Sequence, residues 1–230
     1  MKDLGGRAAS LLTGVAVALT IVAVAIIPFL TPTWAAFAQD RAEAAAWTGF
    51  TPDDLRTATD AILADLVLGP PDFDVKIGGI PVLNEREQEH MRDVRTVFVG
   101  LYAAAAVSVV VLLVASRRRD RVRLWRSVRR GAIGLIVGTV VVGIIGLVAF
   151  DQLFEVFHRI FFPPGSYLFD PTTDRLVQLF PFQFWEESAM AVGAVIIALS
   201  LFTAWVAGRR GSAADALVAD PRTTRLVETA

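Results

Sequence analysis

The chain contains only two histidines, His90 and His158, and each stands just outside a long apolar run. Imidazole is the usual general acid or base near neutral pH, because the ordinary pKa of histidine is about 6.5. A neighbouring carboxylate can fix which ring nitrogen carries the hydrogen. The two histidines are therefore the first candidates for a catalytic acid–base pair.

Acidic residues accompany both histidines at helical spacing. Around the first histidine the spacing is i, i+3, i+6, and around the second it is i, i+4, i+7, so each set shares one face of a helix. We expect these carboxylates to support the imidazoles. The two sets are Glu87, His90 and Asp93, and Asp151, Glu155 and His158.

One helix is predicted to carry His90 and to continue into the membrane. Asn84 and Glu87 have the spacing of a capping box, and the apolar run 97–115 follows without a helix breaker. At about 1.5 Å of rise per residue, the imidazole of His90 then lies roughly 10 Å outside the hydrocarbon. That is the depth of lipid headgroups and glycerol esters.

The second histidine is expected at nearly the same depth. If the apolar run 131–150 continues as a helix, His158 lies roughly 12 Å outside the hydrocarbon. Serine is a weaker candidate for the reacting group, because neither Ser166 nor Ser188 stands in a nucleophile-elbow pattern.

The composition indicates an integral membrane protein, because 54% of the 230 residues are hydrophobic. A signal peptide is the alternative for the first apolar run, since Ala36-Phe37-Ala38 resembles a cleavage site. That run is longer than a signal h-region, so we expect a retained helix. The predicted class is an all-α protein with a single membrane domain, 1–230, and spans at about 8–30, 97–115, 131–150 and 189–207.

Basic residues predict the orientation of the spans. They crowd the short loop 116–130 and follow the last span, so both termini are expected in the cytoplasm. Segments 31–96 and 151–188 then form a small, mostly helical extracytoplasmic cap. Topology and anionic-lipid contact explain the cluster better than nucleic-acid binding does. The basic residues are Arg117, Arg118, Arg119, Arg121, Arg123, Arg126, Arg129, Arg130, Arg209 and Arg210.

The first outward segment is expected to contain a helix followed by an extended piece. The helix begins at Thr51, which can cap it, and ends at Gly69-Pro70-Pro71. Residues 73–82 read as extended or turn-rich. The apolar face of the helix is predicted to be Leu55, Ala58, Ile62, Leu66 and Val67.

The second outward segment is rich in aromatic residues, which suits either an interfacial belt or a lipid-binding wall. Inside the spans we find no ionisable residue, which disfavours a pump, a channel or a secondary transporter. The third span also carries small residues, which favour close helix packing. These are Gly134, Gly138, Gly143 and Gly146.

Two motifs resemble those of the lipoprotein intramolecular transacylases. The first is E-x-x-H-M-x-D-V at the head of the second span, from Glu87 to Val94. The second joins F-H-R-I-F-F, from Phe157, to Y-L-F-D-P-T-T-D-R-L-V, from Tyr167. The resemblance covers nearly the whole chain in layout.

The resemblance implies transfer of the sn-2 acyl chain of a diacylglyceryl lipoprotein to the α-amino group of its own N-terminal cysteine. His90 and His158 match the family's histidine pair, and Asp93, Glu155 and Arg95 match by position. No external cofactor is required, because donor and acceptor belong to one substrate.

We therefore expect a plasma-membrane, multi-pass enzyme whose active face is extracytoplasmic. Its partners would be the lipoprotein substrate and membrane lipids, with no nucleic acid. The sequence indicates no oligomeric state. Residues expected to bind the substrate are Arg95, Arg159, Tyr167 and Phe162.

Two alternatives remain at this point. Glu87-x-x-His90 and Glu155-x-x-His158 repeat the pairing that di-iron four-helix bundles use, which would make the chain a metal-dependent membrane enzyme. Metal analysis of the purified protein would test that reading. The other alternative is a non-catalytic membrane accessory protein that holds a partner through its outward segments.

Overall fold

The computed structural model describes residues 2–117 and 120–219, so Arg118 and Arg119 of the basic cluster lie outside the described residues. The chain divides into two compact units. Among the described residues, the first unit comprises 2–25, 102–117, 120–141 and 194–219, and the second comprises 26–101 and 142–193. The long helices contribute residues to both units.

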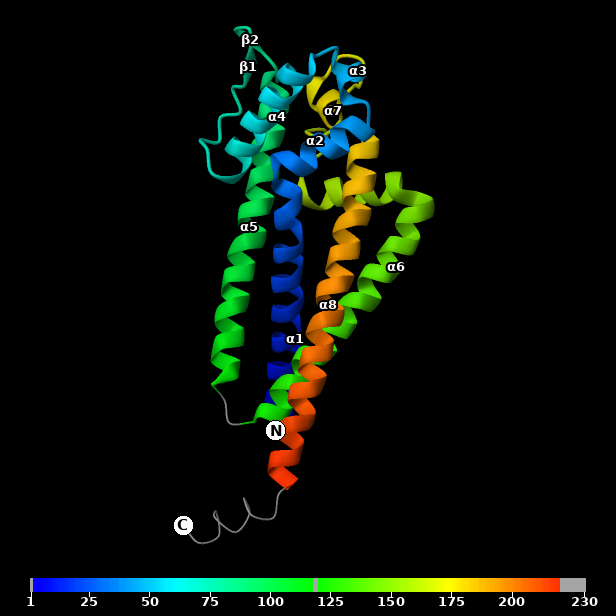
Figure 1. Ribbon diagram of the computed structural model, residues 1–230. Coiled ribbons are helices and arrows are strands. Elements are labelled where there is room, and N and C mark those ends of the chain that lie inside the picture. Colours follow the sequence, from blue (N-terminus) through cyan, green and yellow to red (C-terminus); the bar gives the residue numbers. More distant parts are fainter. Residues whose placement is uncertain (1, 118–119, 220–230) are drawn as a thin grey trace. The chain divides into compact units, whose positions relative to one another are not determined.

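Four long helices dominate the described residues (Figure 1). Each is long and apolar enough to cross a membrane, and together they include the four predicted runs. The prediction of a mostly helical protein with four spans is therefore confirmed. The stretches are Gly5–Leu30, which joins α1 (Lys2–Ile26) to the 3₁₀ helix η1 (Ile27–Leu30), α5 (Glu85–Ser116), α6 (Arg121–Phe161) and Phe182–Ala214 of α8 (Phe182–Ala219).

In the first unit, α1 and α6 approach each other closely at a pair of glycines. A Cβ added to Gly131 would meet the Cα of Gly14 at 2.6 Å, so no larger residue fits there. The close packing that we expected at Gly134, Gly138 and Gly143 is absent, because a Cβ at each meets nothing within 4 Å among the described residues. The expectation was wrong because glycine spacing alone does not indicate which face meets a neighbour.

The second unit gathers the short elements around the first turns of α5 (Figure 1). Helix α2 packs with α4, and α3 packs with α7. One hydrophobic core, which includes Phe73, Ile62 and Leu179, lies between these elements. The elements are α2 (Pro32–Arg41), α3 (Ala44–Thr48), α4 (Pro52–Val67), β1 (Lys76–Ile77), β2 (Ile80–Pro81) and α7 (Arg175–Leu179).

Helix α4 begins as its sequence predicts. The hydroxyl oxygen of Thr51 accepts a hydrogen bond from the backbone N–H of Asp54, and Pro52 occupies the first turn. Four of the five predicted apolar positions are buried. Val67 is the exception, since it is 46% exposed at the last residue of the helix.

The extended piece predicted at residues 73–82 is a short antiparallel hairpin. Lys76 pairs with Pro81, and Ile77 pairs with Ile80. Gly78 and Gly79 connect the strands with φ angles of 58° and 82°, a left-handed conformation that favours glycine.

Helix α6 is not straight near its end. Ala149 has φ −150° and ψ 42°, so the helical path is broken there, and Figure 1 shows the bend. We had expected the run 131–150 to continue directly as a helix, and the depth inferred for His158 depended on that expectation. No proline marks the break, which is why the sequence did not indicate it.

Candidate active site

His90 and His158 lie together in the second unit, although they come from different helices. Their ring centroids are 5.9 Å apart, and the ring planes differ by only 18°. Both residues are buried, with 6% and 9% of their surface exposed. The structure thus brings together the two residues that the sequence singled out.

Aromatic side chains enclose the imidazole pair. Phe162 contacts both rings, with centroids 4.8 Å from His90 and 5.2 Å from His158. A cavity of about 130 Å³ lies beside the pair, and its walls are almost entirely aromatic and aliphatic. The other rings in contact are Phe169 at 5.4 Å from His90, and Phe154, Tyr167 and Phe157 at 4.2, 5.1 and 5.5 Å from His158.

A backbone carbonyl fixes the hydrogen on His158. The Nδ1 atom of His158 lies 2.7 Å from the carbonyl oxygen of Phe154, which can only accept a hydrogen bond. Nδ1 must therefore carry the hydrogen, and in the neutral ring Nε2 has the free lone pair. His90 differs, since its Nδ1 is buried without a hydrogen-bond partner among the described residues.

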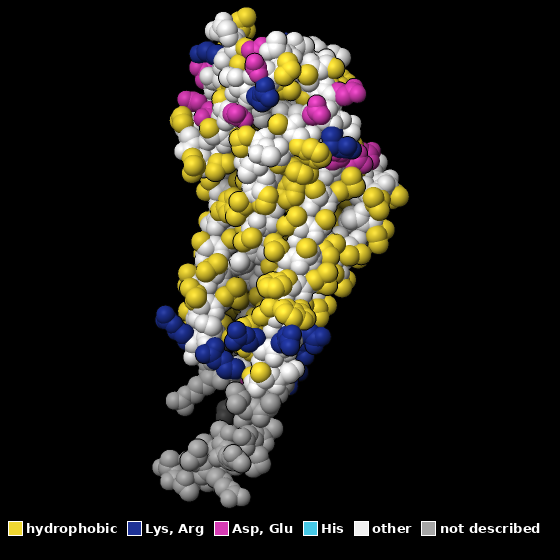
Figure 2. Space-filling model, viewed as in Figure 1, with side chains coloured by type: hydrophobic (Ala, Val, Ile, Leu, Met, Phe, Trp, Pro, Cys, Tyr) yellow, Lys and Arg dark blue, Asp and Glu magenta, His cyan; other side chains and the backbone are white. Residues whose placement is uncertain are grey.

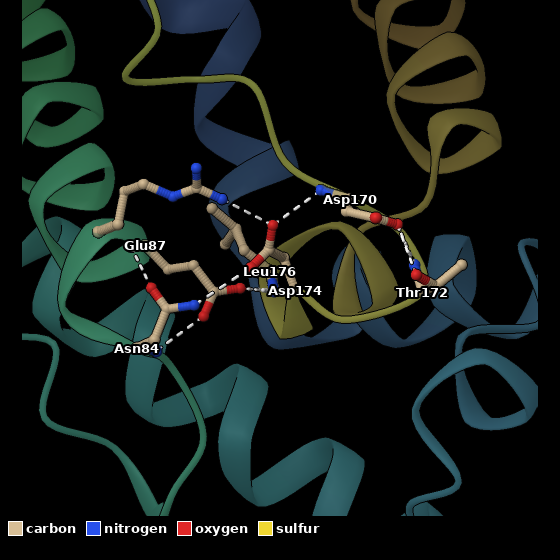
Figure 3. Close-up of polar contacts among 7 residues, drawn as sticks. Asn84, Glu87, Asp170, Thr172, Asp174 and Leu176 are labelled. Atoms are coloured by element: carbon tan, nitrogen blue, oxygen red, sulfur yellow. Dashed lines mark hydrogen bonds and ion pairs between the residues drawn. The ribbon is translucent and has the colours of Figure 1, made fainter.

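The carboxylate of Glu87 accepts hydrogen bonds from backbone N–H groups and not from an imidazole. It accepts the backbone N–H of Asn84 at 2.7 Å and that of Leu176 at 2.6 Å (Figure 3). The side chain of Asn84 in turn accepts the N–H of Glu87 at 3.0 Å, which confirms the predicted capping box. Glu87 thereby ties the start of α5, and with it His90, to the start of α7.

None of the other expected supporting carboxylates is hydrogen-bonded to an imidazole among the described residues. Glu155 pairs with Arg159, and Asp151 accepts from Gln152 at 2.8 Å. Asp93 makes no polar side-chain contact with any described residue. Helical spacing can place an acid on the same face of a helix as a histidine. It could not show that the backbone carbonyl of Phe154, and not a carboxylate, would orient the ring of His158.

Asp174 is a positioning residue that the sequence analysis did not single out. Its carboxylate accepts from Asn84 Nδ2 at 3.2 Å, from Arg86 at 2.8 Å and from the backbone N–H of Asp170 at 2.7 Å (Figure 3). The side chain is buried, so these bonds hold the loop before α7 against the start of α5. The D-P-T-T-D sequence was the available signal, because acids that open a short helix commonly bond backbone groups.

Asp170 closes the same loop with a turn of its own. Its carboxylate accepts from the hydroxyl and from the backbone N–H of Thr172, at 2.7 and 2.8 Å. These hydrogen bonds stabilise the charged form and lower the pKa of Asp170 below its ordinary value.

The residues expected to bind substrate fall into two groups. Phe162 and Tyr167 contact the histidine rings, as described above. Arg159 lies at the surface in its pair with Glu155, and 66% of its side chain is exposed. Arg95 belongs elsewhere, because its guanidinium donates to the backbone carbonyls of Asp65 and Gly69 at the end of α4. These contacts give Arg95 a structural role, and its contact with the substrate stays a prediction.

The geometry does not favour the metal-binding alternative. Glu87 and Glu155 are engaged in the bonds described above, so the two E-x-x-H pairs do not direct carboxylates toward a shared point. In the part of the chain that the structure describes, no three His, Asp or Glu side chains gather as ion ligands would.

Comparisons with known proteins agree with this fold. The structure is similar to that of the membrane integral lipoprotein intramolecular transacylase Lit from Bacillus cereus, with a TM-score of 0.74 and 18% sequence identity over 93% of this chain and 99% of that one. A variant of that protein, in which one histidine is replaced by alanine, aligns with a TM-score of 0.67 and 19% identity over 93% of this chain and 97% of that one.

Sequence comparisons point the same way. An uncharacterized protein from Aquifex aeolicus (strain VF5) is 25% identical over 117 residues, which are 50% of this chain and 51% of that protein, so the match spans about half the length of this curated relative. The family model described as "Lipoprotein intramolecular transacylase Lit" matches residues 10–185, well over half of the chain. The chain therefore belongs to the lipoprotein intramolecular transacylase family.

Proposed function

We propose that this chain moves the sn-2 acyl chain of a diacylglyceryl lipoprotein to the α-amino group of that lipoprotein's N-terminal cysteine. The product is the lyso form of the lipoprotein. The observation that carries the proposal is the buried pair of facing imidazoles, which has one ring fixed by a carbonyl and one ring nitrogen without a partner among the described residues. Membership of a family of lipoprotein transacylases supports the same reaction.

The reaction needs one base and one acid. An α-amino group has an ordinary pKa near 8, so at neutral pH it must lose a proton before its nitrogen can attack. The amine nitrogen then bonds to the ester carbonyl carbon, the bond from that carbon to the sn-2 oxygen breaks, and this oxygen receives a proton. The proton taken from the amine balances the proton given to the oxygen, so no external cofactor is required.

We assign proton transfer to His158, which takes the proton from the amine as the base and returns it to the sn-2 oxygen as the acid. Burial, followed by the neighbouring His158, lowers the pKa of His90 to about 4, so its neutral ring is assigned a hydrogen bond with the reacting groups. The Nε2 atom of neutral His158 has the lone pair that can take a proton, because Nδ1–H is held by the carbonyl of Phe154. Nδ1 of His90 has no partner among the described residues, so it is available to the substrate. Two cationic imidazoles with centroids 5.9 Å apart would repel each other, which suits a pair that carries no more than one positive charge at a time.

The surroundings suit a lipid ester. Phe162 and Tyr167 are proposed to contact the acyl chain, and the exposed Arg159 to contact the polar part of the lipoprotein. On the proposed orientation, both termini are cytoplasmic, and residues 31–96 and 151–188 form an extracytoplasmic cap on the plasma membrane. The arginines around the loop 116–130 support this orientation.

The test replaces each histidine and measures lyso-lipoprotein formation in reconstituted membranes by mass spectrometry. His90→Ala and His158→Ala should each lower turnover by about 10² to 10⁴, and the double variant should be little worse than either one, because the two residues act as a unit. His158→Asn keeps an N–H that can donate to Phe154 but removes the base, so it should fold normally and stay inactive. Glu89→Ala, an exposed change on the same helix, is the matched control and should keep normal turnover.

Normal turnover in either single histidine variant would overturn the acid–base pair. A collapsed thermal melt in His158→Asn would instead make the ring structural. Normal lipoprotein processing in the double variant would restore the accessory-protein alternative.

A further inference from the structure

We propose that the first unit carries a second lipid site, a groove between α1 and α6 that binds an anionic glycerophospholipid. The groove encloses about 750 Å³. It lies wholly in the first unit, whereas both histidines lie in the second, so this site and the acyl-transfer site can fail separately.

The charged end of the groove suits a phosphate. Arg7, Arg123 and Arg130 line it, and none of its described lining residues is acidic. Asp120, which directly precedes α6, pairs with Arg123 at 3.2 Å and lines the adjoining pockets instead. Guanidinium groups bind phosphate oxygens with strong, charge-assisted hydrogen bonds. Figure 2 shows Lys and Arg side chains gathered at this end of the helices.

The rest of the groove suits an acyl chain. Leu11, Val15, Ala18 and Leu135 line it beyond the arginines. Leu11 and Val15 are 71% and 56% exposed, so large apolar side chains face the groove and are left largely uncovered by the described residues. Gly134 opens the floor, because a Cβ there would meet nothing within 4 Å among the described residues. Arginines at one end of an apolar trough match a phospholipid, with its headgroup at the membrane surface and its chain in the hydrocarbon.

The floor of the groove is held in place by contacts between α1 and α6. Gly14 and Gly131 allow the backbones to meet, and the hydroxyl groups of Ser10 and Ser127 are hydrogen-bonded at 2.7 Å. Ser127 also donates to the carbonyl of Arg123 at 2.8 Å, so the serine hydroxyls are satisfied within the protein. Recognition of the ligand therefore depends on the arginines, whose positive charge favours a headgroup with net negative charge over a zwitterionic one.

The first test compares phosphatidylglycerol with phosphatidylcholine on the full chain in detergent, by native mass spectrometry of bound lipid. The wild-type protein should prefer phosphatidylglycerol. Arg123→Gln with Arg130→Gln should weaken that binding roughly 25-fold, since each arginine near an anionic lipid contributes a factor of about five. Arg117→Gln with Arg210→Gln is the matched control, because both arginines are exposed in the same unit but do not line the groove.

The second test blocks the apolar part and leaves the arginines in place. Gly134→Leu should fill the floor and lower phosphatidylglycerol binding, whereas Gly138→Leu, one turn further along α6 and outside the groove, should not. Both positions have space for a side chain, so both variants should fold. Soluble glycerol phosphate should not displace the lipid.

Three outcomes would overturn the lipid site. The first is equal binding of the two lipids, and the second is wild-type binding in the double Arg123/Arg130 variant. The third is full displacement by glycerol phosphate together with normal binding in Gly134→Leu, which would mean that the groove holds a phosphate and no acyl chain.

Discussion

Glu87 shows how one buried side chain positions the residues around it. The residue is 1% exposed, and its carboxylate accepts backbone N–H groups from the start of α5 and the start of α7. His90 follows less than one helical turn later on α5. Any loosening of this carboxylate should therefore change both the stability of the fold and the position of the imidazole.

Replacing Glu87 by Gln should lower the free energy of unfolding by about 1 to 3 kcal/mol. The amide offers one acceptor oxygen to two backbone donors, so one buried N–H loses its partner. A thermal melt of the full chain measures the loss, and the exposed Glu89→Gln serves as control. A melt of Glu87→Gln that matches the wild type would contradict the role assigned here.

At the scale of single residues, the sequence predicted only hydrogen bonds between residues that are close along the chain. The capping box joins Asn84 and Glu87, which are three residues apart, and the sequence predicted it. The bond from Leu176 crosses 89 residues, and no periodicity in the sequence indicates such a partner. The carbonyl that holds His158 was missed for a different reason, since spacing rules compare side chains and do not consider backbone acceptors.

At the scale of elements, Arg95 joins α5 to the end of α4. The last carbonyls of a helix have no partner within it, and the Arg95 guanidinium donates to one of them, the carbonyl of Asp65. It also donates to the carbonyl of Gly69, just beyond the helix. The contact fixes the end of α4, whose apolar face includes Ile62 and Leu66, against the helix that carries His90.

Arg95→Gln should destabilise the end of α4 by about 1 to 3 kcal/mol, because two partly buried carbonyls lose a charged donor. Limited proteolysis should then cut faster around residues 68–72. Arg92→Gln, on the same helix, is the matched control. Unchanged cleavage in Arg95→Gln would show that the contact does not hold the segment.

Element boundaries followed from the sequence where a residue type enforces them. Thr51 begins α4 as predicted, because it can cap the helix, and Pro52 suits the first turn. The hairpin turn at Gly78 and Gly79 was not predicted, since residues 73–82 read only as extended or turn-rich. The break at Ala149 was not foreseen, since alanine has no such preference and is the best helix former.

At the scale of the whole molecule, the apolar runs predict where the spans lie, and the arginines predict how the spans are oriented. Hydropathy located all four long helices, because a span must be about 20 apolar residues long. The distribution of arginines predicts which ends face the cytoplasm, and that orientation stays a prediction.

Cysteine labelling tests the orientation, and the chain is suited to it because it contains no cysteine of its own. Ile80→Cys lies on the hairpin at a position that is 72% exposed, and Arg117→Cys lies at the exposed end of α5. In intact cells, a membrane-impermeant thiol reagent should label residue 80 only, and residue 117 only after the membrane is opened. The reverse labelling pattern would contradict the predicted orientation and would mean that the proposed site faces the cytoplasm.

The aromatic wall around the two imidazoles also bears on a competing reaction. A base that activates an amine can equally activate water, which would release the acyl chain as a free fatty acid. A cavity of about 130 Å³ has room for only about four water molecules at liquid density, and an ester and an amine would displace most of them. On the proposed mechanism, the rings of Phe154 and Phe169, which line this cavity, thus favour transfer of the acyl chain to the amine over its release by water.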